Sequence, residues 1–178
     1  MDNARKIKTR LHHAAYVTHD QEANRKFYEE LIGFPLVATW SEMEPLFGAE
    51  RSYCHTFYDL GDGECLAFFQ FAKKEDQEFF EQKAPLSPMQ HLALKCDEQT
   101  QQAIYQRLKD AVYEPSRVHL VEHGYCRSLY VPDPNGILLE FTVDHPEMNR
   151  IMEERGLSAH EDLVKWLSGD HTTNNNYR

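Results

Sequence analysis

The sequence predicts an α+β fold made of two modules with the same plan, because residues 11–36 recur in outline as residues 89–115. Each copy opens an apolar strand with a histidine, His13 in the first and His91 in the second, and places an aromatic residue fourteen positions later. An internal repeat of this kind is strong evidence about the fold, because it means that one structural unit occurs twice.

A helix is predicted after the strand in each copy. Apolar residues that recur four positions apart line one face of a helix. These positions are Ala23, Phe27 and Leu31 in the first copy, and Ile104, Leu108 and Val112 in the second. The second helix is expected over about residues 99–111.

Antiparallel strands complete each module. In the first, residues 52–60 and 64–71 are rich in aromatic and β-compatible residues, and the intervening Gly-Asp-Gly is typical of a hairpin turn. In the second, an extended piece at 117–121 precedes a hairpin over 127–143 whose turn is Asp-Pro-Asn-Gly. Residues 37–50 show no clear pattern and are interpreted as a connection, in which Trp40 either lines a cleft or packs in the core.

The predicted organisation is one paired-module domain over residues 1–144, with a first module at about 9–75 and a second at about 88–144. Residues 73–88 are charged and then proline-rich, as in a linker, and include a segment able to form a short helix. Residues 145–178 form a helical extension and a polar tail outside the repeat. Within the extension, Ser158 is expected to cap a helix that includes residues 162–167.

Composition limits the partners. The net charge is -10 and the pI is about 5.4, which argues against nucleic acid and anionic membranes, because both require clustered Lys and Arg. We therefore expect a small-molecule substrate. The four cysteines show no CxxC spacing, which excludes a zinc ribbon and indicates a reducing compartment. We predict a cytoplasmic protein that forms a homodimer.

Several motifs, in this order, resemble the vicinal oxygen chelate superfamily, which includes glyoxalase I, bleomycin-resistance proteins, fosfomycin-resistance thiol transferases and extradiol dioxygenases. The resemblance covers roughly residues 10–144. It implies paired βαβββ modules that form an open, curled mixed sheet around a metal. The residues that carry it are His13 with Asp20, Phe27-Tyr28, Leu31-Ile32-Gly33-Phe34, His91, and the segment Tyr130-Val131-Pro132-Asp133-Pro134-Asn135-Gly136 ahead of Glu140.

A metal site is predicted from His13, His91 and Glu140. Two imidazoles and one carboxylate on one face of an ion leave positions open for substrate and oxygen, an arrangement suited to Fe(II) and tolerated by Mn(II), Ni(II) or Zn(II). A lone strand histidine is more often structural, but two at equivalent repeat positions favour ligands. His12 is left out of the set, because strand alternation should point it away from His13.

The first module is predicted to lack a counterpart of Glu140. Glyoxalase I has a carboxylate ligand there, whereas aligning the last strands of the two modules places Ala67 at that position. Alanine cannot ligate a metal, so the predicted three-ligand site resembles the dioxygenases and thiol transferases more than the lyase.

His123 and Tyr130 are the predicted catalytic residues, because the segment around them resembles the loop with which ring-cleaving enzymes touch substrate oxygens. An exposed loop histidine is the alternative for His123, and His55 is the one candidate for the further histidine that those enzymes use. The first-choice function is an oxidoreductase, an Fe(II) extradiol dioxygenase acting on a small catechol-like ring. A lyase, isomerase or thiol transferase acting on a vicinal-oxygen substrate, and a non-catalytic drug-binding protein, are the alternatives.

Overall fold

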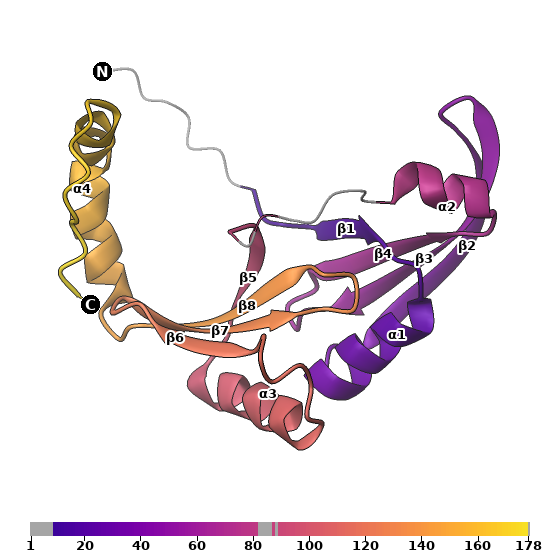
Figure 1. Cartoon of the computed structure of the whole chain (residues 1–178), viewed down its shortest axis with the longest axis horizontal. Coiled ribbons are helices and arrows are strands. Elements are labelled where there is room, and N and C mark those ends of the chain that lie inside the picture. Colours follow the sequence, from indigo (N-terminus) through magenta and orange to yellow (C-terminus); the bar gives the residue numbers. More distant parts are fainter. Residues whose placement is uncertain (1–8, 82–86, 88, 178) are drawn as a thin grey trace. The chain divides into compact units, whose positions relative to one another are not determined.

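The chain forms two units, Met1–Pro85 and Leu86–Arg178, each with its own sheet (Figure 1). The structure, a computed structural model, describes residues 9–81, 87 and 89–177. Much of the predicted linker, residues 82–86 and 88, lies outside the described residues. The boundaries predicted for the modules and the extension stay predictions, and the two units are described separately.

The first unit has a four-stranded mixed sheet in the order β1-β4-β3-β2, in which β1 runs parallel to β4 and the other pairs are antiparallel. Its elements in chain order are β1 His13–Val17, α1 Gln21–Arg25, η1 Lys26–Ile32, β2 Leu36–Leu46, β3 Ala49–Asp59, β4 Cys65–Phe71 and α2 Lys74–Phe80.

The second unit repeats this topology, with the order β5-β8-β7-β6 and β5 parallel to β8. Its elements are β5 His91–Lys95, α3 Glu98–Asp110, β6 His119–Glu122, β7 Cys126–Pro132, β8 Leu138–Asp144 and α4 Met148–Leu167. The predicted α+β fold of two like modules with a C-terminal helix is confirmed.

The same device starts the first helix of each unit. The side chain of Asp20 accepts hydrogen bonds from the backbone N–H groups of Glu22 and Ala23, both at 2.9 Å. Asp97 accepts one from the N–H of Thr100 at 2.7 Å. An aspartate at this position satisfies N–H groups that have no partner within the helix. The repeated Asp therefore fixes where each helix leaves its strand.

The first helix buries a different face from the one predicted. It changes from α1 to the π-helix η1 after Arg25, and a π turn carries more residues than an α turn. Its buried residues are Asn24, Phe27, Tyr28 and Ile32, whereas the predicted core positions Ala23 and Leu31 are only half-buried. The Tyr28 ring lies 5.0 Å from that of Phe68 and 5.3 Å from that of Tyr58, which places this helix on one face of the sheet.

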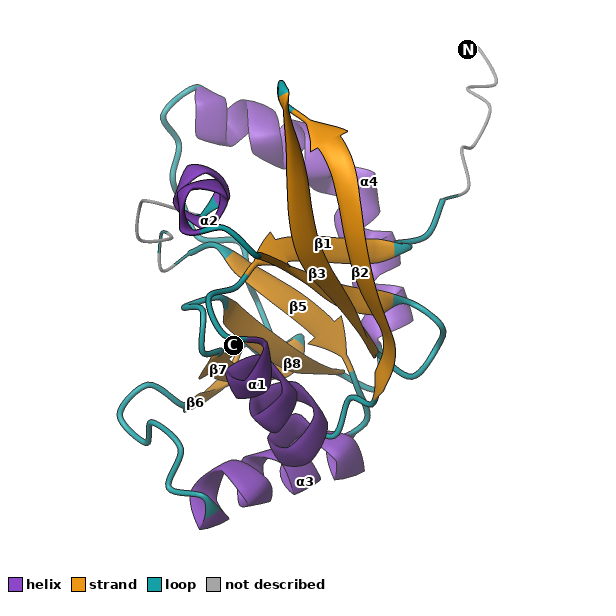
Figure 2. Cartoon of the chain, turned by 90° about the vertical axis from the view of Figure 1, so that its right-hand side faces the viewer, coloured by secondary structure: helices purple, strands orange, loops and turns teal. Residues whose placement is uncertain are grey.

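The connection predicted at residues 37–50 is instead the edge strand β2 and the start of β3, joined as a long ribbon (Figure 2). Because β2 pairs with β3 alone and exposes most of its side chains, it lacks the alternation that burial of one face imposes. Trp40 is 57% exposed, so it does not pack in the core. The predicted short helix after β4 is present as α2.

The C-terminal extension contains one continuous helix, α4, rather than the capped second helix predicted at Ser158. Ser158 lies within α4, and its hydroxyl donates to the carboxylate of Asp162 at 2.8 Å. Val112 also differs from prediction: it follows α3 in a left-handed conformation and is exposed. Among the described residues, no helix is both long and apolar enough to cross a membrane.

Candidate functional site

The predicted site residues are divided between the units. His13 belongs to the first, and His91, His123, Tyr130 and Glu140 belong to the second. Each group is called a half-site below. No three His, Cys, Asp or Glu side chains within residues 9–81, 87 and 89–177 are gathered closely enough to hold a metal.

In the second half-site, strand register places the polar side chains on one face. Tyr130 on β7 is directly opposite Glu140 on β8, and Glu140 pairs on its other side with Ala93, two residues after His91 on β5. Residues that pair across strands, and residues two apart along one strand, point to the same side of a sheet. His91, Tyr130 and Glu140 therefore share a face.

His91 and Glu140 are in direct contact. The Nε2 atom of His91 lies 2.8 Å from Oε2 of Glu140, and its Nδ1 atom lies 3.0 Å from the backbone oxygen of Met89. A carbonyl can only accept, so Nδ1 carries a proton and Nε2 is the nitrogen presented to the carboxylate. In this tautomer Nε2 and Oε2 both offer lone pairs, which is the arrangement that two ligands of one metal ion require.

The pair fits a divalent metal. Imidazole nitrogen and carboxylate oxygen bind such ions at about 2.0–2.2 Å, so two ligands at right angles lie about 3 Å apart. The observed separation is 2.8 Å. Glu140 is buried and also accepts a hydrogen bond from the hydroxyl of Ser128, and backbone support of the second imidazole nitrogen is typical of metal-binding histidines. The donor set therefore matches two adjacent positions of one ion.

Tyr130 connects this pair to the second predicted catalytic residue. Its hydroxyl lies 3.1 Å from Nε2 of His123, and its ring centroid lies 5.9 Å from that of His91. Burial, and then the neighbouring carboxylate of Glu140, raise the pKa of Tyr130. The phenol therefore keeps its proton and can donate a hydrogen bond. The structure thus brings His91, Glu140, Tyr130 and His123 together in one unit.

In the first half-site, His13 is the first residue of β1 and lies among aromatic rings. Its ring centroid is 5.7 Å from that of Phe57 and 6.5 Å from that of His55. The Nδ1 atoms of His12 and His13 are 2.7 Å apart, so the expectation that His12 points away is wrong. The physical reason is that His12 precedes β1, and strand alternation does not apply to it.

His55 is a residue whose surroundings sequence reasoning missed. Its ring stacks on Phe69 at 3.6 Å, and its buried Nε2 atom has no hydrogen-bond partner within the described part of the chain. Burial, and then the nearby His13, lower the pKa of His55, which keeps the imidazole neutral. The alternation of Tyr53, His55 and Phe57 along β3 was the available signal that they form one aromatic face with His13.

Strand register also tests the position of Ala67. Ala15, two residues after His13, pairs with Ala67, just as Ala93, two residues after His91, pairs with Glu140. Ala67 is therefore the first unit's counterpart of Glu140, as the alignment predicts. It is fully buried and brings no ligand atom.

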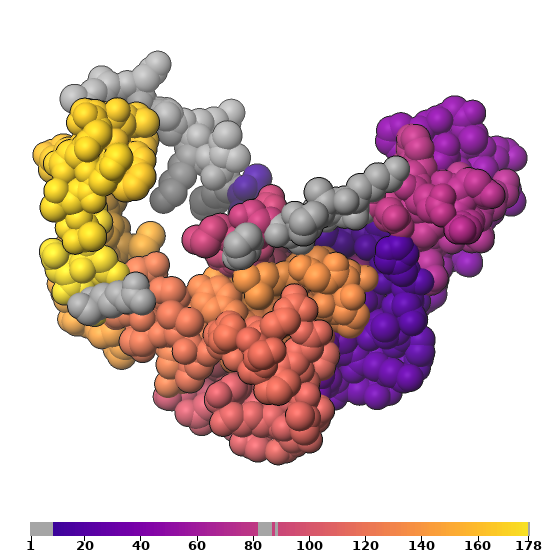
Figure 3. Space-filling view, viewed as in Figure 1, coloured from indigo at the N-terminus to yellow at the C-terminus, as the bar shows by residue number. Residues whose placement is uncertain are grey.

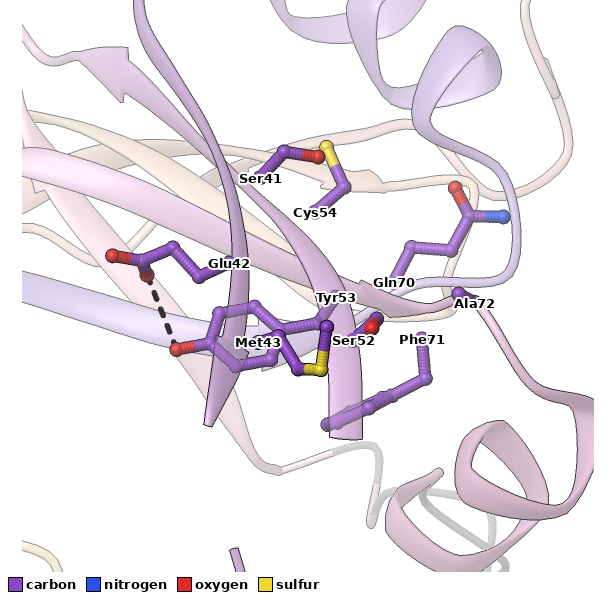
Figure 4. A pocket seen from close by; sticks show the side chains of 9 residues that line it. All are labelled: Ser41, Glu42, Met43, Ser52, Tyr53, Cys54, Gln70, Phe71 and Ala72. Carbon is purple, nitrogen blue, oxygen red and sulfur yellow. Dashed lines mark hydrogen bonds between the residues drawn. The ribbon is translucent and has the colours of Figure 1, made fainter. Parts of the chain in front are cut away.

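A pocket of about 550 Å³ lies elsewhere on the first unit, over the middle of β2 and β3 and the end of β4 (Figure 4). Among the residues that line the pocket, the hydroxyl of Tyr53 donates a hydrogen bond to the carboxylate of Glu42 at 3.1 Å. None of the predicted site residues lines this pocket, so it is not the candidate site.

Comparison with known proteins identifies the fold. Residues 10–141 match the model of the Glyoxalase/Bleomycin resistance protein/Dioxygenase superfamily. Among curated proteins, none matches the chain.

Solved structures with the same fold include three named proteins. The fosfomycin resistance protein FosX from Listeria monocytogenes is 15% identical, with a TM-score of 0.53 over 80% of this chain and 98% of that one. Lactoylglutathione lyase from Agrobacterium tumefaciens is 19% identical, with a TM-score of 0.52 over 78% and 96%. The oxidase ChaP-H2 is 18% identical, with a TM-score of 0.52 over 78% and 96%. At these identities the likeness establishes the fold.

Proposed function

The chain belongs to the Glyoxalase/Bleomycin resistance protein/Dioxygenase superfamily, and we propose that it is a metal-dependent enzyme, an Fe(II) extradiol dioxygenase that opens a small catechol-like ring. The observation that carries the proposal is the contact between His91 and Glu140, with Nδ1 of His91 held by a backbone carbonyl. This arrangement would present one imidazole nitrogen and one carboxylate oxygen to the same ion.

His13 is the third proposed ligand. It occupies the first position of β1, as His91 occupies the first position of β5, and each pairs with the first residue of the strand parallel to it. Fe(II) is our first choice, and Mn(II), Ni(II) or Zn(II) would suit the same donors. FosX from Listeria monocytogenes has been crystallised with Mn(II), which is consistent with divalent metals in proteins of this fold.

Bound by these residues, Fe(II) would supply coordination positions for the two adjacent substrate oxygens and electrons for O2. Tyr130, kept protonated by its raised pKa, would donate a hydrogen bond to a substrate oxygen. His123, whose Nε2 atom lies 3.1 Å from that phenol, would take a proton from the catechol and return it to the product. Both atoms of O2 enter the product as one ring carbon–carbon bond breaks, so no separate reductant is needed.

The first half-site supports an aromatic substrate. Phe57, His55 and Phe69 present rings on the face that carries His13, and flat rings of this kind stack on a planar ligand. Arg51 lies on the same face by strand alternation, but its guanidinium is paired with Asp76. It is therefore not available to an anionic substrate such as a phosphonate.

A cytoplasmic homodimer completes the proposal. All four cysteines are free thiols, which suits a reducing compartment. Large apolar side chains are exposed along α4, among them Leu157 and Leu167, and exposed apolar surface of this kind supports a partner interface.

The test is reconstitution of metal-free protein with Fe(II), Mn(II), Ni(II) or Zn(II) under anaerobic conditions. We expect the Fe(II) form to consume O2 with at least one member of a catechol panel and to give a ring-opened product. In parallel, each form is offered methylglyoxal with glutathione, and an epoxide with a thiol. No O2 uptake, together with turnover in either parallel assay, would replace the dioxygenase with a lyase or thiol transferase. Tight binding of a drug without metal or turnover would favour the binding protein.

A further inference from the structure

The C-terminal extension lies beyond the part of the chain that matches the family model. The family match ends at residue 141. FosX from Listeria monocytogenes matches over 98% of its own length and yet covers 80% of this chain. The extension comprises α4 and the tail that follows it, the yellow segment in Figures 1 and 3. It belongs to the same unit as His123 and Tyr130.

The tail turns back after α4 and runs along it (Figure 1). Gly169 has a φ of 92°, a left-handed conformation that reverses the chain, and the ring of His171 lies 4.2 Å from that of Trp166. At the far end of the tail, the hydroxyl of Tyr177 donates to Glu154 at 2.7 Å. The tail is therefore attached to α4 at both of its ends.

This return brings Asn175 to the loop that carries His123. The side-chain amide of Asn175 donates to the backbone oxygen of His123 at 3.1 Å. The amide oxygen of Asn175 accepts from the backbone N–H of Tyr177 at 3.1 Å, which orients the NH2 group toward the loop. The N–H of His145, which precedes α4, donates to the backbone oxygen of Tyr125 at 2.9 Å and continues the pairing of β7 with β8. The tail thus holds the loop through Asn175.

We propose that the C-terminal extension is a brace for the His123 loop and that Asn175 is its positioning residue. The functional part of this inference rests on the proton-transfer role proposed for His123. A general acid-base group must stay within hydrogen-bond reach of its partner, and displacement by about 1 Å lowers the rate strongly. The loop's own restraints include the bond from the N–H of His123 to the backbone oxygen of Cys126, the bond from the N–H of Gly124 to the carboxylate of Glu122, and the contact of the His123 ring with Tyr130. The bond from Asn175 adds a restraint from outside the loop.

The first readout does not depend on activity. In the full-length protein, Asn175→Ala removes the donor, and Asn175→Asp keeps the size and the acceptor but cannot donate. Asn174→Ala and Asn176→Ala are matched controls from the same run of asparagines. We expect amide hydrogen exchange in residues 122–126 to rise about fivefold in both Asn175 variants, on the scale of one lost hydrogen bond, and to stay unchanged in the controls. Wild-type protection of the loop in both Asn175 variants would overturn the brace.

The second readout separates the brace from the proposed activity. With a turned-over substrate, we expect the Asn175 variants to lower kcat about fivefold, with KM and metal content unchanged. A faster-exchanging loop with wild-type kcat would overturn the positioning role. If no substrate of any class is turned over, the proposed function fails, while the exchange experiment still decides whether the brace exists.

Discussion

Arg51 and Asp76 form a pair whose removal should destabilise the first unit. Nη1 of Arg51 lies 3.1 Å from Oδ1 of Asp76, and the two side chains are 10% and 13% exposed. Nε of Arg51 also donates to the backbone oxygen of Leu46, and its guanidinium lies 5.0 Å from the ring centroids of Phe79 and Phe80. The pair therefore joins β3 to α2. The perturbation is Asp76→Asn, which keeps the volume and removes the charge.

The expected loss of stability follows from the burial of the Arg51–Asp76 pair. Removing one member of a buried ion pair costs about 3–5 kcal/mol, because the remaining charge is left without compensation. Here both side chains retain some exposure, and Arg51 keeps its bond to Leu46 and its ring contacts. We therefore expect a loss of about 2–3 kcal/mol in the free energy of unfolding. The double variant Arg51→Met/Asp76→Asn should recover most of that loss, because no buried charge remains.

The assay is urea unfolding of the metal-free protein in a Trp166→Phe background. Trp40 is then the one remaining tryptophan, and its fluorescence reports on the first unit alone. Separate observation of this unit is needed, because two units need not unfold in a single transition. A change below about 0.5 kcal/mol in Asp76→Asn, the usual range for surface substitutions, would refute the reasoning. A double variant as unstable as Asp76→Asn would refute it as well.

Three further predictions concern His123, Tyr58 and His55. His123→Phe should leave metal content intact and lower turnover about a hundredfold, the scale of losing a general acid-base group. Tyr130→Phe should lower turnover less, because only one hydrogen bond is lost. Steady-state kinetics and elemental analysis test this, and wild-type turnover in His123→Phe would contradict it. Burial raises the pKa of Tyr58 to about 12, above an unfolded value of about 10, so its contribution to stability is complete below about pH 10 and is lost as the pH rises through 12. The free energy of unfolding, measured from pH 9 to 12, should fall less steeply with pH in Tyr58→Phe than in the wild type, by up to about 1.4 kcal/mol per pH unit. An unchanged slope would contradict the raised pKa of Tyr58. His55→Phe should leave the first unit at least as stable as in the wild type, because the buried Nε2 atom of His55 has no hydrogen-bond partner in the described residues and the new ring can still stack on Phe69. A loss above about 1 kcal/mol in the free energy of unfolding, measured by the urea assay, would contradict this.

The sequence was sufficient to predict the elements that repeat. The two histidine-led strands and the Gly-containing turns each carry a local signal that does not depend on distant contacts. The same repeat identified Ala67 as the residue of the first unit that is equivalent to Glu140 in the second, because the two copies share their strand register. Local chemistry and internal symmetry were enough for these features.

Features that depend on tertiary context could not be read in the same way. The edge strand β2 is exposed on both faces, so no alternation marks it, and the π turns of η1 change which residues are buried after Asn24. The contact between His12 and His13 depends on where β1 begins. Asn175 meets His123 only because the chain reverses after α4, and no short-range pattern links residues that far apart.

The central claim is that His13, His91 and Glu140 hold one divalent metal, and metal content tests it most directly. Wild-type protein and the variants His13→Ala, His91→Ala and Glu140→Gln are loaded with Fe(II) anaerobically, desalted and measured by elemental analysis. His160→Ala, an exposed histidine on α4, is the matched control. We predict about one ion per chain in the wild type and the control, and loss of most of the metal in each of the three variants. Wild-type metal content in His91→Ala would contradict the account.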